Sequence, residues 1–193
     1  ANYWYELHPG TALPGGRYEH AAVWSPAADG IYVFGGFLAS RGPVLLNAMA
    51  NMWEELNLSG ALPDVRSQHT AVWSHEADGM YVFGGYDGQG SGTYFNDLWF
   101  HGCEDSRGRA VKASTWEMRS PGGNAPHQRY AHAAVWSPAG DGMYVFGGRD
   151  GRYLGESDFE WHITNWAVVS CRGVEPVGKR TLHFRWTRRR PGP

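Results

Sequence analysis

The stretch RYEHAAVWSPAADGIYVFGG at residues 17–36 has two close copies of the same length in this chain of 193 residues. It returns as RSQHTAVWSHEADGMYVFGG at residues 66–85 and as RYAHAAVWSPAGDGMYVFGG at residues 129–148. Each copy places an Asp-Gly pair between two β-prone runs and ends on a Gly-Gly doublet. An Asp-Gly pair in this setting is a strong signal for a β-hairpin. The repeats therefore predict pairs of short antiparallel strands.

A tryptophan stands 13 positions before the first residue of each copy and fixes the length of the repeat. The three pairs are Trp4 and Arg17, Trp53 and Arg66, and Trp116 and Arg129. The copies start 49 and then 63 positions apart, whereas a propeller blade takes about 40 to 50 residues. The longer interval predicts an inserted loop, which we place around residues 102–113, between the third and fourth strands of its unit.

Each unit predicts four strands. The first two are the His-Ala-Ala-Val-Trp and Ile/Met-Tyr-Val-Phe runs, and the third is clearest at residues 94–100. In the first unit we expect the third strand inside residues 44–52. The fourth strand carries the spaced tryptophan, including Trp166 in the third unit. By this register the chain begins with a lone strand around Trp4 and ends with a lone strand in residues 180–187, where an Arg-x-x-His sequence forms a weaker fourth copy.

The repeat resembles that of the kelch family. The features that carry the resemblance are the Gly-Gly doublet, the Tyr-x-Asn-Asp-Leu-Trp run at residues 94–99, the spaced tryptophan and the Arg-x-x-His sequence. They cover residues 3–155 well and residues 156–187 weakly. The resemblance implies an all-β fold of four-stranded antiparallel blades around a central axis.

Three blades are too few for a standard ring, because propellers usually have four to eight. We therefore expect an incomplete, open propeller, with self-association possible through its open blade edges. The expected organisation is one kelch-repeat segment over residues 1–187, followed by an Arg/Pro-rich tail at 188–193. The repeat units are expected at about residues 17–58, 66–120 and 129–170, with a partial unit at 180–187.

The charge, hydropathy and cysteine content of the chain argue against several classes of function. The net charge of −2 gives no general reason to bind nucleic acid, although the arginines near the C-terminus would attract phosphate. No stretch is long and apolar enough to cross a membrane. The two cysteines, Cys103 and Cys171, have no CxxC spacing, which argues against a zinc site and slightly favours a reducing, cytoplasmic compartment.

Candidate binding residues follow from the expected topology. The loops between strands one and two are near copies, whereas the loops between strands two and three differ, and variable loops on a uniform scaffold often carry specificity. The candidates on the rim formed by the variable loops are Arg41, Tyr86, Asp87, Arg149, Asp150, Arg152 and Tyr153. The repeated arginines, expected near the mouth of the central channel to meet an acidic or carbonyl-rich ligand, are Arg17, Arg66 and Arg129. A structural role for these arginines, and for the repeated histidines, is the alternative.

Some kelch-type propellers are enzymes, so the chain must be compared with them. Copper oxidases resembling galactose oxidase need a Tyr-Cys crosslink, and neither Cys103 nor Cys171 lies in a suitable part of the repeat. Specifier proteins use a Glu-x-x-x-Asp-x-x-x-His iron motif; Asp158 and His162 have its second spacing, but Leu154 replaces the glutamate. We therefore expect an interaction module that binds another protein, with no catalytic residues, metal or cofactor.

Overall fold

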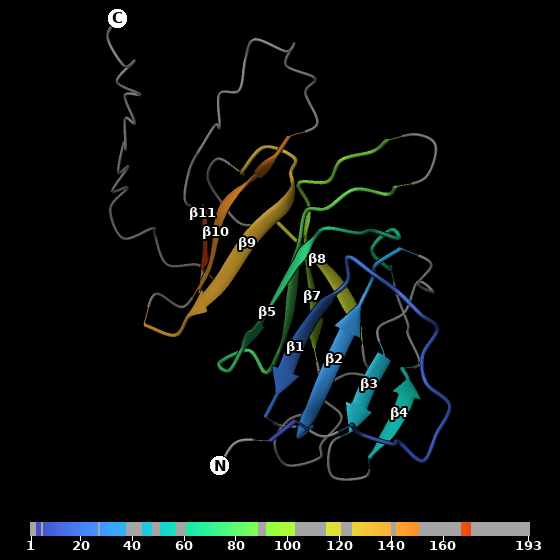
Figure 1. Ribbon diagram of the computed structural model, residues 1–193. Helices are drawn as coiled ribbons and strands as arrows, with labels where there is room; N and C mark the ends of the chain where they lie inside the picture. The colour runs from blue at the N-terminus through green and yellow to red at the C-terminus, as the bar shows by residue number, and fades with distance from the viewer. Residues whose placement is uncertain are drawn as a thin grey trace, which may run out of the picture.

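The computed structural model describes residues 3–4, 6–26, 28–37, 44–47, 51–56, 61–88, 92–102, 115–120, 125–139, 142–150 and 167–170. Within these ranges the chain forms three antiparallel β-sheets and no helix, so none of the described segments is a helix that could span a membrane. The three sheets follow one another in sequence order and lie side by side (Figure 1). This is the all-β architecture of separate blades that the repeat predicts.

Two of the sheets have four strands and the third has three. The first sheet contains β1 (Ala21–Ser25), β2 (Gly30–Phe34), β3 (Val44–Asn47) and β4 (Met52–Glu55). The second sheet contains β5 (Thr70–Ser74), β6 (Gly79–Phe83), β7 (Leu98–Gly102) and β8 (Trp116–Arg119). The third sheet contains β9 (Tyr130–Ser137), β10 (Gly142–Arg149) and β11 (Ala167–Ser170).

The strand order confirms most of the predicted blade. The first two sheets are simple meanders in which each strand pairs with the next along the chain. The third strand of the first sheet lies inside the expected window at 44–52, and the long interval between β7 and β8 is where the insertion was expected. In the second sheet β7 begins at Leu98, because Tyr94 forms only an isolated bridge with Tyr86.

The third sheet differs from the prediction. The segment after Trp166 was expected to be a fourth strand, but β11 pairs directly with β10, so it occupies the third position in its sheet. The apolar, β-branched residues Val168 and Val169 pair with Tyr144 and Met143, and such residues favour pairing with an available edge. A tryptophan spacing gives a position along the chain and cannot by itself give a position in the sheet.

The N-terminal segment also differs. The described residues before Tyr18 contain no strand, and Trp4 is fully exposed, so the lone strand expected there is not formed. A strand needs a neighbouring strand to take up its backbone hydrogen bonds, and no described strand pairs with the residues around Trp4. The segment instead lies along β4: the Trp53 N–H donates to the Thr11 hydroxyl at 2.6 Å, and the hydroxyl donates to the Trp53 carbonyl at 3.1 Å.

The hairpin predicted from the Asp-Gly pairs is present, and the aspartate and the glycine have separate roles in it. The positive φ belongs to the aspartates, 44° at Asp29 and 46° at Asp78. Gly79 lies in β6, where an added Cβ would come within 2.5 Å of the Phe100 ring. The glycine therefore allows a close approach of β7, while aspartate tolerates the left-handed turn position.

The core lies between the sheets. Successive side chains of a strand point to opposite faces, so each sheet has a forward face toward the next sheet and a rear face toward the preceding one. The first core cluster joins forward-face Val23, Tyr32 and Phe34 to rear-face Trp73, Met80, Val82, Trp99 and Trp116. The second joins forward-face Val72, Tyr81, Phe83, Leu98 and Phe100 to rear-face Met143 and Val145. The second sheet is therefore buried on both faces.

The same aromatic contacts recur at both junctions. Tyr32 stacks on Trp73 with ring centroids 5.7 Å apart, and Tyr81 stacks on Trp136 at 5.4 Å. An edge-on contact joins Phe34 to His69 at 5.3 Å, and the corresponding rings of Phe83 and His132 lie 5.5 Å apart. Trp73 and Trp136 thus pack between blades, and the two junctions are copies of one interface.

Candidate binding rim

The Gly-Gly doublets form the contact between neighbouring blades. The Gly36 N–H donates to the Arg66 carbonyl at 2.9 Å, and the Gly85 N–H donates to the Arg129 carbonyl at 2.8 Å. An added Cβ at Gly84, the first glycine of its doublet, would lie 2.6 Å from the Arg129 carbonyl oxygen. No side chain fits between backbones this close, so the doublets have a structural role at the junctions.

Arg66 is the most buried of the repeated arginines, with 1% of its surface exposed. Its Nη1 donates to the Gly84 carbonyl at 3.1 Å, and its two terminal nitrogens reach the Asp97 carboxylate at 2.6 and 2.9 Å. The Trp99 Nε1–H donates to the same carboxylate at 2.6 Å. Burial alone would raise the pKa of Asp97, but the hydrogen bonds and charge of Arg66, together with the Trp99 bond, hold this pKa below its usual range.

The other two arginines occupy the same position in their repeats. Arg129 is buried, and it donates from Nε to the His127 carbonyl at 3.1 Å and from Nη1 to the Gly147 carbonyl at 2.8 Å. Arg17 is half-buried and donates from Nε to the Gly15 carbonyl at 3.3 Å. Arg66 and Arg129 thus bind the doublet carbonyl of their own blade, whereas the predicted ligand role of the three arginines stays a prediction.

Two of the repeated histidines, His69 and His132, are neutral packing residues at the junctions. Burial lowers the pKa of His69 to about 3, with a further contribution from the charge of Arg66. Burial lowers the pKa of His132 to about 4, and Arg129 adds to this effect. His101, fully buried beside Trp116, has its pKa lowered to about 4 by burial. Their burial agrees with the structural role that the repeat suggests.

The loops between strands two and three lie beside the segments that lead into strand one. Ser67 and Tyr86 exchange two backbone hydrogen bonds at 2.9 and 3.1 Å. Tyr18 bridges Phe37, and Tyr130 pairs with Arg149, in the corresponding places of the other two sheets. The structure therefore brings these loops to one rim, as the topology predicts, and the turns between strands one and two lie at the opposite end of the hairpins.

Three partly exposed tyrosines meet on this rim. The ring centroids of Tyr86 and Tyr94 lie 6.0 Å apart, those of Tyr86 and Tyr130 5.4 Å, and those of Tyr94 and Tyr130 5.2 Å. We call these three residues the tyrosine cluster. Sequence reasoning identified only Tyr86, because Tyr94 was assigned to a strand and Tyr130 was treated as part of the repeat. The signal for Tyr130 was the Arg-Tyr dipeptide, which the second repeat replaces with Arg-Ser.

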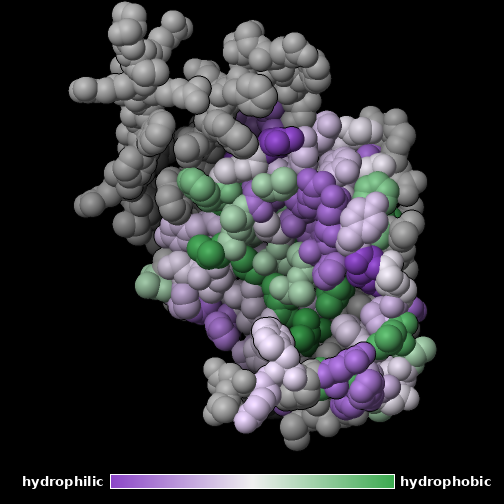
Figure 2. Space-filling model, viewed as in Figure 1, coloured by the Kyte–Doolittle hydropathy of each residue, from purple (hydrophilic) through white to green (hydrophobic). Residues whose placement is uncertain are grey.

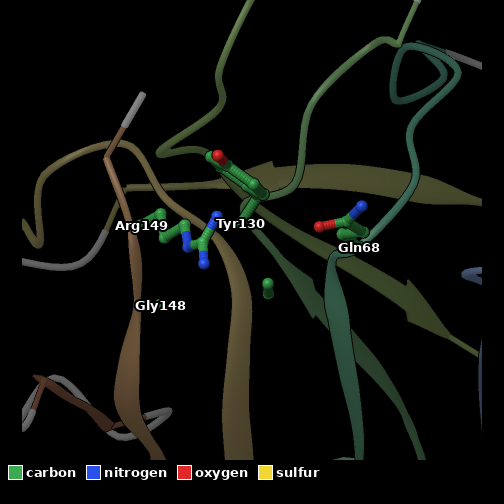
Figure 3. A pocket seen from close by; sticks show the side chains of 5 residues that line it. Gln68, Tyr130, Gly148 and Arg149 are labelled. Atoms are coloured by element: carbon green, nitrogen blue, oxygen red, sulfur yellow. The ribbon is translucent and has the colours of Figure 1, made fainter. Parts of the chain in front are cut away.

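A depression lies next to the tyrosine cluster, between the second and third sheets. It has a volume of about 330 Å³ and is lined by Gln68, Tyr130, Ala131, Gly148 and Arg149. Figure 3 shows the polar ends of Arg149 and Gln68 pointing into the same space, with the Tyr130 ring between them. The Ala131 N–H donates to the Gln68 carbonyl at 2.9 Å, so the floor of the depression is held by a bond between blades.

The remaining candidates divide into two groups. Asp87 and Asp150 follow Tyr86 and Arg149 directly and are half-buried on the rim. Arg41, Arg152 and Tyr153 lie outside the described residues, as do Cys103, Cys171, Asp158 and His162. In the part of the chain that the structure describes, no three His, Cys, Asp or Glu residues come together as a possible metal site.

Comparison with known proteins identifies the family. The KLHDC2/KLHL20/DRC7 Kelch-repeats domain matches residues 1–183. No curated protein matches significantly. The chains of 120 solved structures match this one. One of them, from the structure titled "Structure of YjhT", is 23% identical in sequence, with a TM-score of 0.54. The match covers 74% of this chain and 36% of the YjhT chain. The present chain thus spans about a third of YjhT and shares its fold. The repeats, the stacked blades and the domain match together show that this chain belongs to the kelch-repeat family.

Proposed function

We propose that this chain is a protein-interaction module that binds its partner on the rim formed by the variable loops. The observation that carries the proposal is the tyrosine cluster beside Arg149. The proposal assigns the chain a binding role and no catalytic step.

The tyrosine cluster has the properties of an interface centre. Tyrosine and arginine are enriched among the residues that dominate binding energy, since they offer large contact areas together with hydrogen-bonding groups. The rings of Tyr86, Tyr94 and Tyr130 already contact one another, so little side-chain freedom remains to be lost on binding. Arg149 is exposed beside them and can pair with an acidic or carbonyl group of a partner.

The opposite rim lacks these properties. Its turns repeat the leading serine and the Asp-Gly pair, and the exposed residues between them include Pro26 and His75. The Ser25 and Ser74 hydroxyls accept hydrogen bonds from Ala28 and Ala77 within these turns, at 3.2 and 3.1 Å. Turns that repeat one another and satisfy their own backbone offer little to distinguish one partner from another. The difference between the two rims therefore supports binding at the tyrosine cluster.

Site-specific photocrosslinking tests the proposal. A benzoyl-phenylalanine placed at position 86 or 149 should give the same protein adduct in an extract of the source cells. The matched positions 26 and 75 on the opposite rim should not give that adduct. Adducts from positions 26 and 75 alone, or equal adducts from both rims, would overturn the proposed surface.

A further inference from the structure

Aromatic side chains continue along the rim from the tyrosine cluster into the first blade. Tyr18 and Phe37 stack there, with ring centroids 5.2 Å apart and an angle of 10° between the rings. Gly88 of the second blade lies against the Phe37 ring, since an added Cβ would come within 2.5 Å of it. Tyr86, a member of the tyrosine cluster, stands only two positions before Gly88. We call Tyr18, Phe37 and the tyrosine cluster together the aromatic row.

The aromatic row is accessible and has a mixed, amphipathic character. Tyr18 is 53% exposed, and Phe37 and the tyrosine cluster are half-buried. Figure 2 shows strongly hydrophobic side chains gathered over β1 and β2, whereas the surface above these strands, toward the rim, is mostly hydrophilic or intermediate. This surface suits a partner segment that combines apolar rings with polar backbone groups better than one that is wholly apolar.

The polar groups beside the aromatic row are rich in hydrogen-bond donors. The Arg149 guanidinium carries donors only, and the Gln68 amide and the tyrosine hydroxyls can donate as well. Figure 3 shows the polar ends of Arg149 and Gln68 directed into the space beside the Tyr130 ring, where the depression of about 330 Å³ lies. A segment that offers carbonyl oxygens and few N–H groups would match these donors.

The charges on the rim favour neither a strongly acidic nor a strongly basic partner. Arg149 is exposed, and Asp87 and Asp150 are half-buried on the same rim. Carboxylates near a cation weaken its attraction for an acidic segment. A basic group would meet Arg149, and the rings of the tyrosine cluster, with centroids 5.2 to 6.0 Å apart, contact one another too closely to admit a cation between them. An uncharged segment therefore fits the rim best.

We propose that the aromatic row binds a proline-rich segment of the partner. Proline has no backbone N–H, so such a segment presents carbonyl oxygens to Arg149 and Gln68 without donors that need a partner. It adopts an extended polyproline II helix, which has no internal hydrogen bonds and is largely ordered before binding. Proline-rich segments in this form bind surfaces lined by aromatic side chains. This inference rests on the proposed binding rim and specifies the chemistry of what binds there.

A nuclear magnetic resonance titration of the isotope-labelled chain tests the proposal, with a decaproline peptide that is acetylated and amidated at its ends. The peptide should shift signals saturably, with a Kd below about 1 mM. Tyr18→Ala, Tyr86→Ala and Tyr130→Ala should each weaken binding about tenfold or more. His75→Ala on the opposite rim is the matched control and should stay within about twofold. Because Tyr18 is more than half exposed, its removal should leave the unfolding transition unchanged, which keeps the test valid if another variant unfolds.

Two peptides of the same length and with the same blocked ends separate proline recognition from weaker kinds of binding. One alternates glycine with glutamate and the other alternates glycine with serine. Decaproline should bind about tenfold or more tightly than either. The absence of a saturable shift with decaproline, equal binding by either comparison peptide, or full-strength binding by the tyrosine variants would overturn the proposal.

The photocrosslinking experiment distinguishes this inference from the proposed function. Adducts at positions 86 and 149 should map to a proline-rich stretch of the partner. Adducts at these positions on a stretch without proline would overturn the proline-rich ligand and leave the binding rim in place. Decaproline binding together with adducts at positions 26 and 75 alone would support the ligand chemistry of the aromatic row and overturn the rim as the partner's binding surface.

Discussion

The N–H of Gly36 donates to the carbonyl oxygen of Arg66 at 2.9 Å, and this bond joins the first blade to the second. Gly85 and Arg129 make the same bond at the next junction. The Gly-Gly doublet and the arginine of the next repeat, 30 positions apart at the first junction and 44 at the second, are therefore the two sides of one contact. This explains why both return together in every repeat.

Replacing a junction glycine should destabilise the fold strongly. Gly85 has a φ of 94°, and an added Cβ would lie 2.7 Å from the Ser67 carbonyl oxygen. The left-handed conformation costs a residue with a side chain about 1–2 kcal/mol, and the clash adds to this cost. We expect Gly85→Ala to lower the free energy of unfolding in urea by more than about 2 kcal/mol. Gly16→Ala, where an added Cβ meets nothing within 4 Å, should change it by less than about 0.5 kcal/mol; equal effects would contradict the role of the doublet.

Removing Arg66 should cost far more than removing its counterpart in the first blade. Arg66→Ala leaves the Asp97 carboxylate without its ion pair, and breaking a buried pair typically costs about 3–5 kcal/mol. Arg17 makes no ion pair within the described residues, so Arg17→Ala serves as the matched control and should cost about 1 kcal/mol or less. Urea unfolding of both variants measures the difference, and comparable losses would show that the pair with Asp97 adds little.

Stability should fall as the pH drops below about 6.5. Histidine in an unfolded chain binds a proton near this pH, whereas burial lowers the pKa of His69 to about 3 and those of His101 and His132 to about 4. Between these values the unfolded state binds protons that the folded state does not, so the free energy of unfolding decreases with falling pH. Each histidine contributes up to about 1.4 kcal/mol per pH unit. Asp97, whose pKa is also lowered, adds to the loss only below about pH 4.

Urea titrations at pH 7.5, 6.5, 5.5 and 4.5 measure this dependence. The unfolding free energy should be nearly constant above pH 7 and decline below 6.5. The His69→Phe variant keeps an aromatic ring at the junction but takes up one proton fewer on unfolding. Its unfolding free energy should therefore decline less steeply, by up to about 1.4 kcal/mol per pH unit. A stability that rises on acidification, or an unchanged slope in this variant, would contradict the neutral, buried state of His69.

The fold was largely predictable because the repeat reports backbone geometry directly. A Gly-Gly doublet after an apolar strand and an Asp-Gly pair between strands each require a particular local conformation. The structure has positive φ angles at both kinds of site. The errors concern pairing in space. Trp4 has the same spacing to its arginine as Trp53 and Trp116, and Trp166 has it to within one residue. The segment after Trp4 nevertheless lies along β4 without forming a strand, and the segment after Trp166 pairs directly with β10.

The location of the candidate site was predictable from the sequence, but the set of residues that forms it was not. Topology alone assigns the variable loops to one rim, and Tyr86 and Arg149 lie there. Tyr94 and Tyr130 join them only because two loops and two blades converge, a contact between residues 36 positions apart that no local pattern reports. Conversely, the burial of Arg66 depends on its ion pair with Asp97, which lies directly before β7 in the same blade.

The affinity of the crosslinked partner for rim variants tests the functional account most directly. Isothermal titration should show that Tyr86→Ala, Tyr130→Ala and Arg149→Ala each weaken binding about tenfold or more, which corresponds to at least about 1.4 kcal/mol. Pro26→Ala and His75→Ala on the opposite rim should stay within about twofold of the unaltered chain, with all five variants checked for an unchanged unfolding transition. If the tyrosine and arginine variants bind at full strength, or the opposite-rim variants lose more affinity, the partner does not bind at the tyrosine cluster.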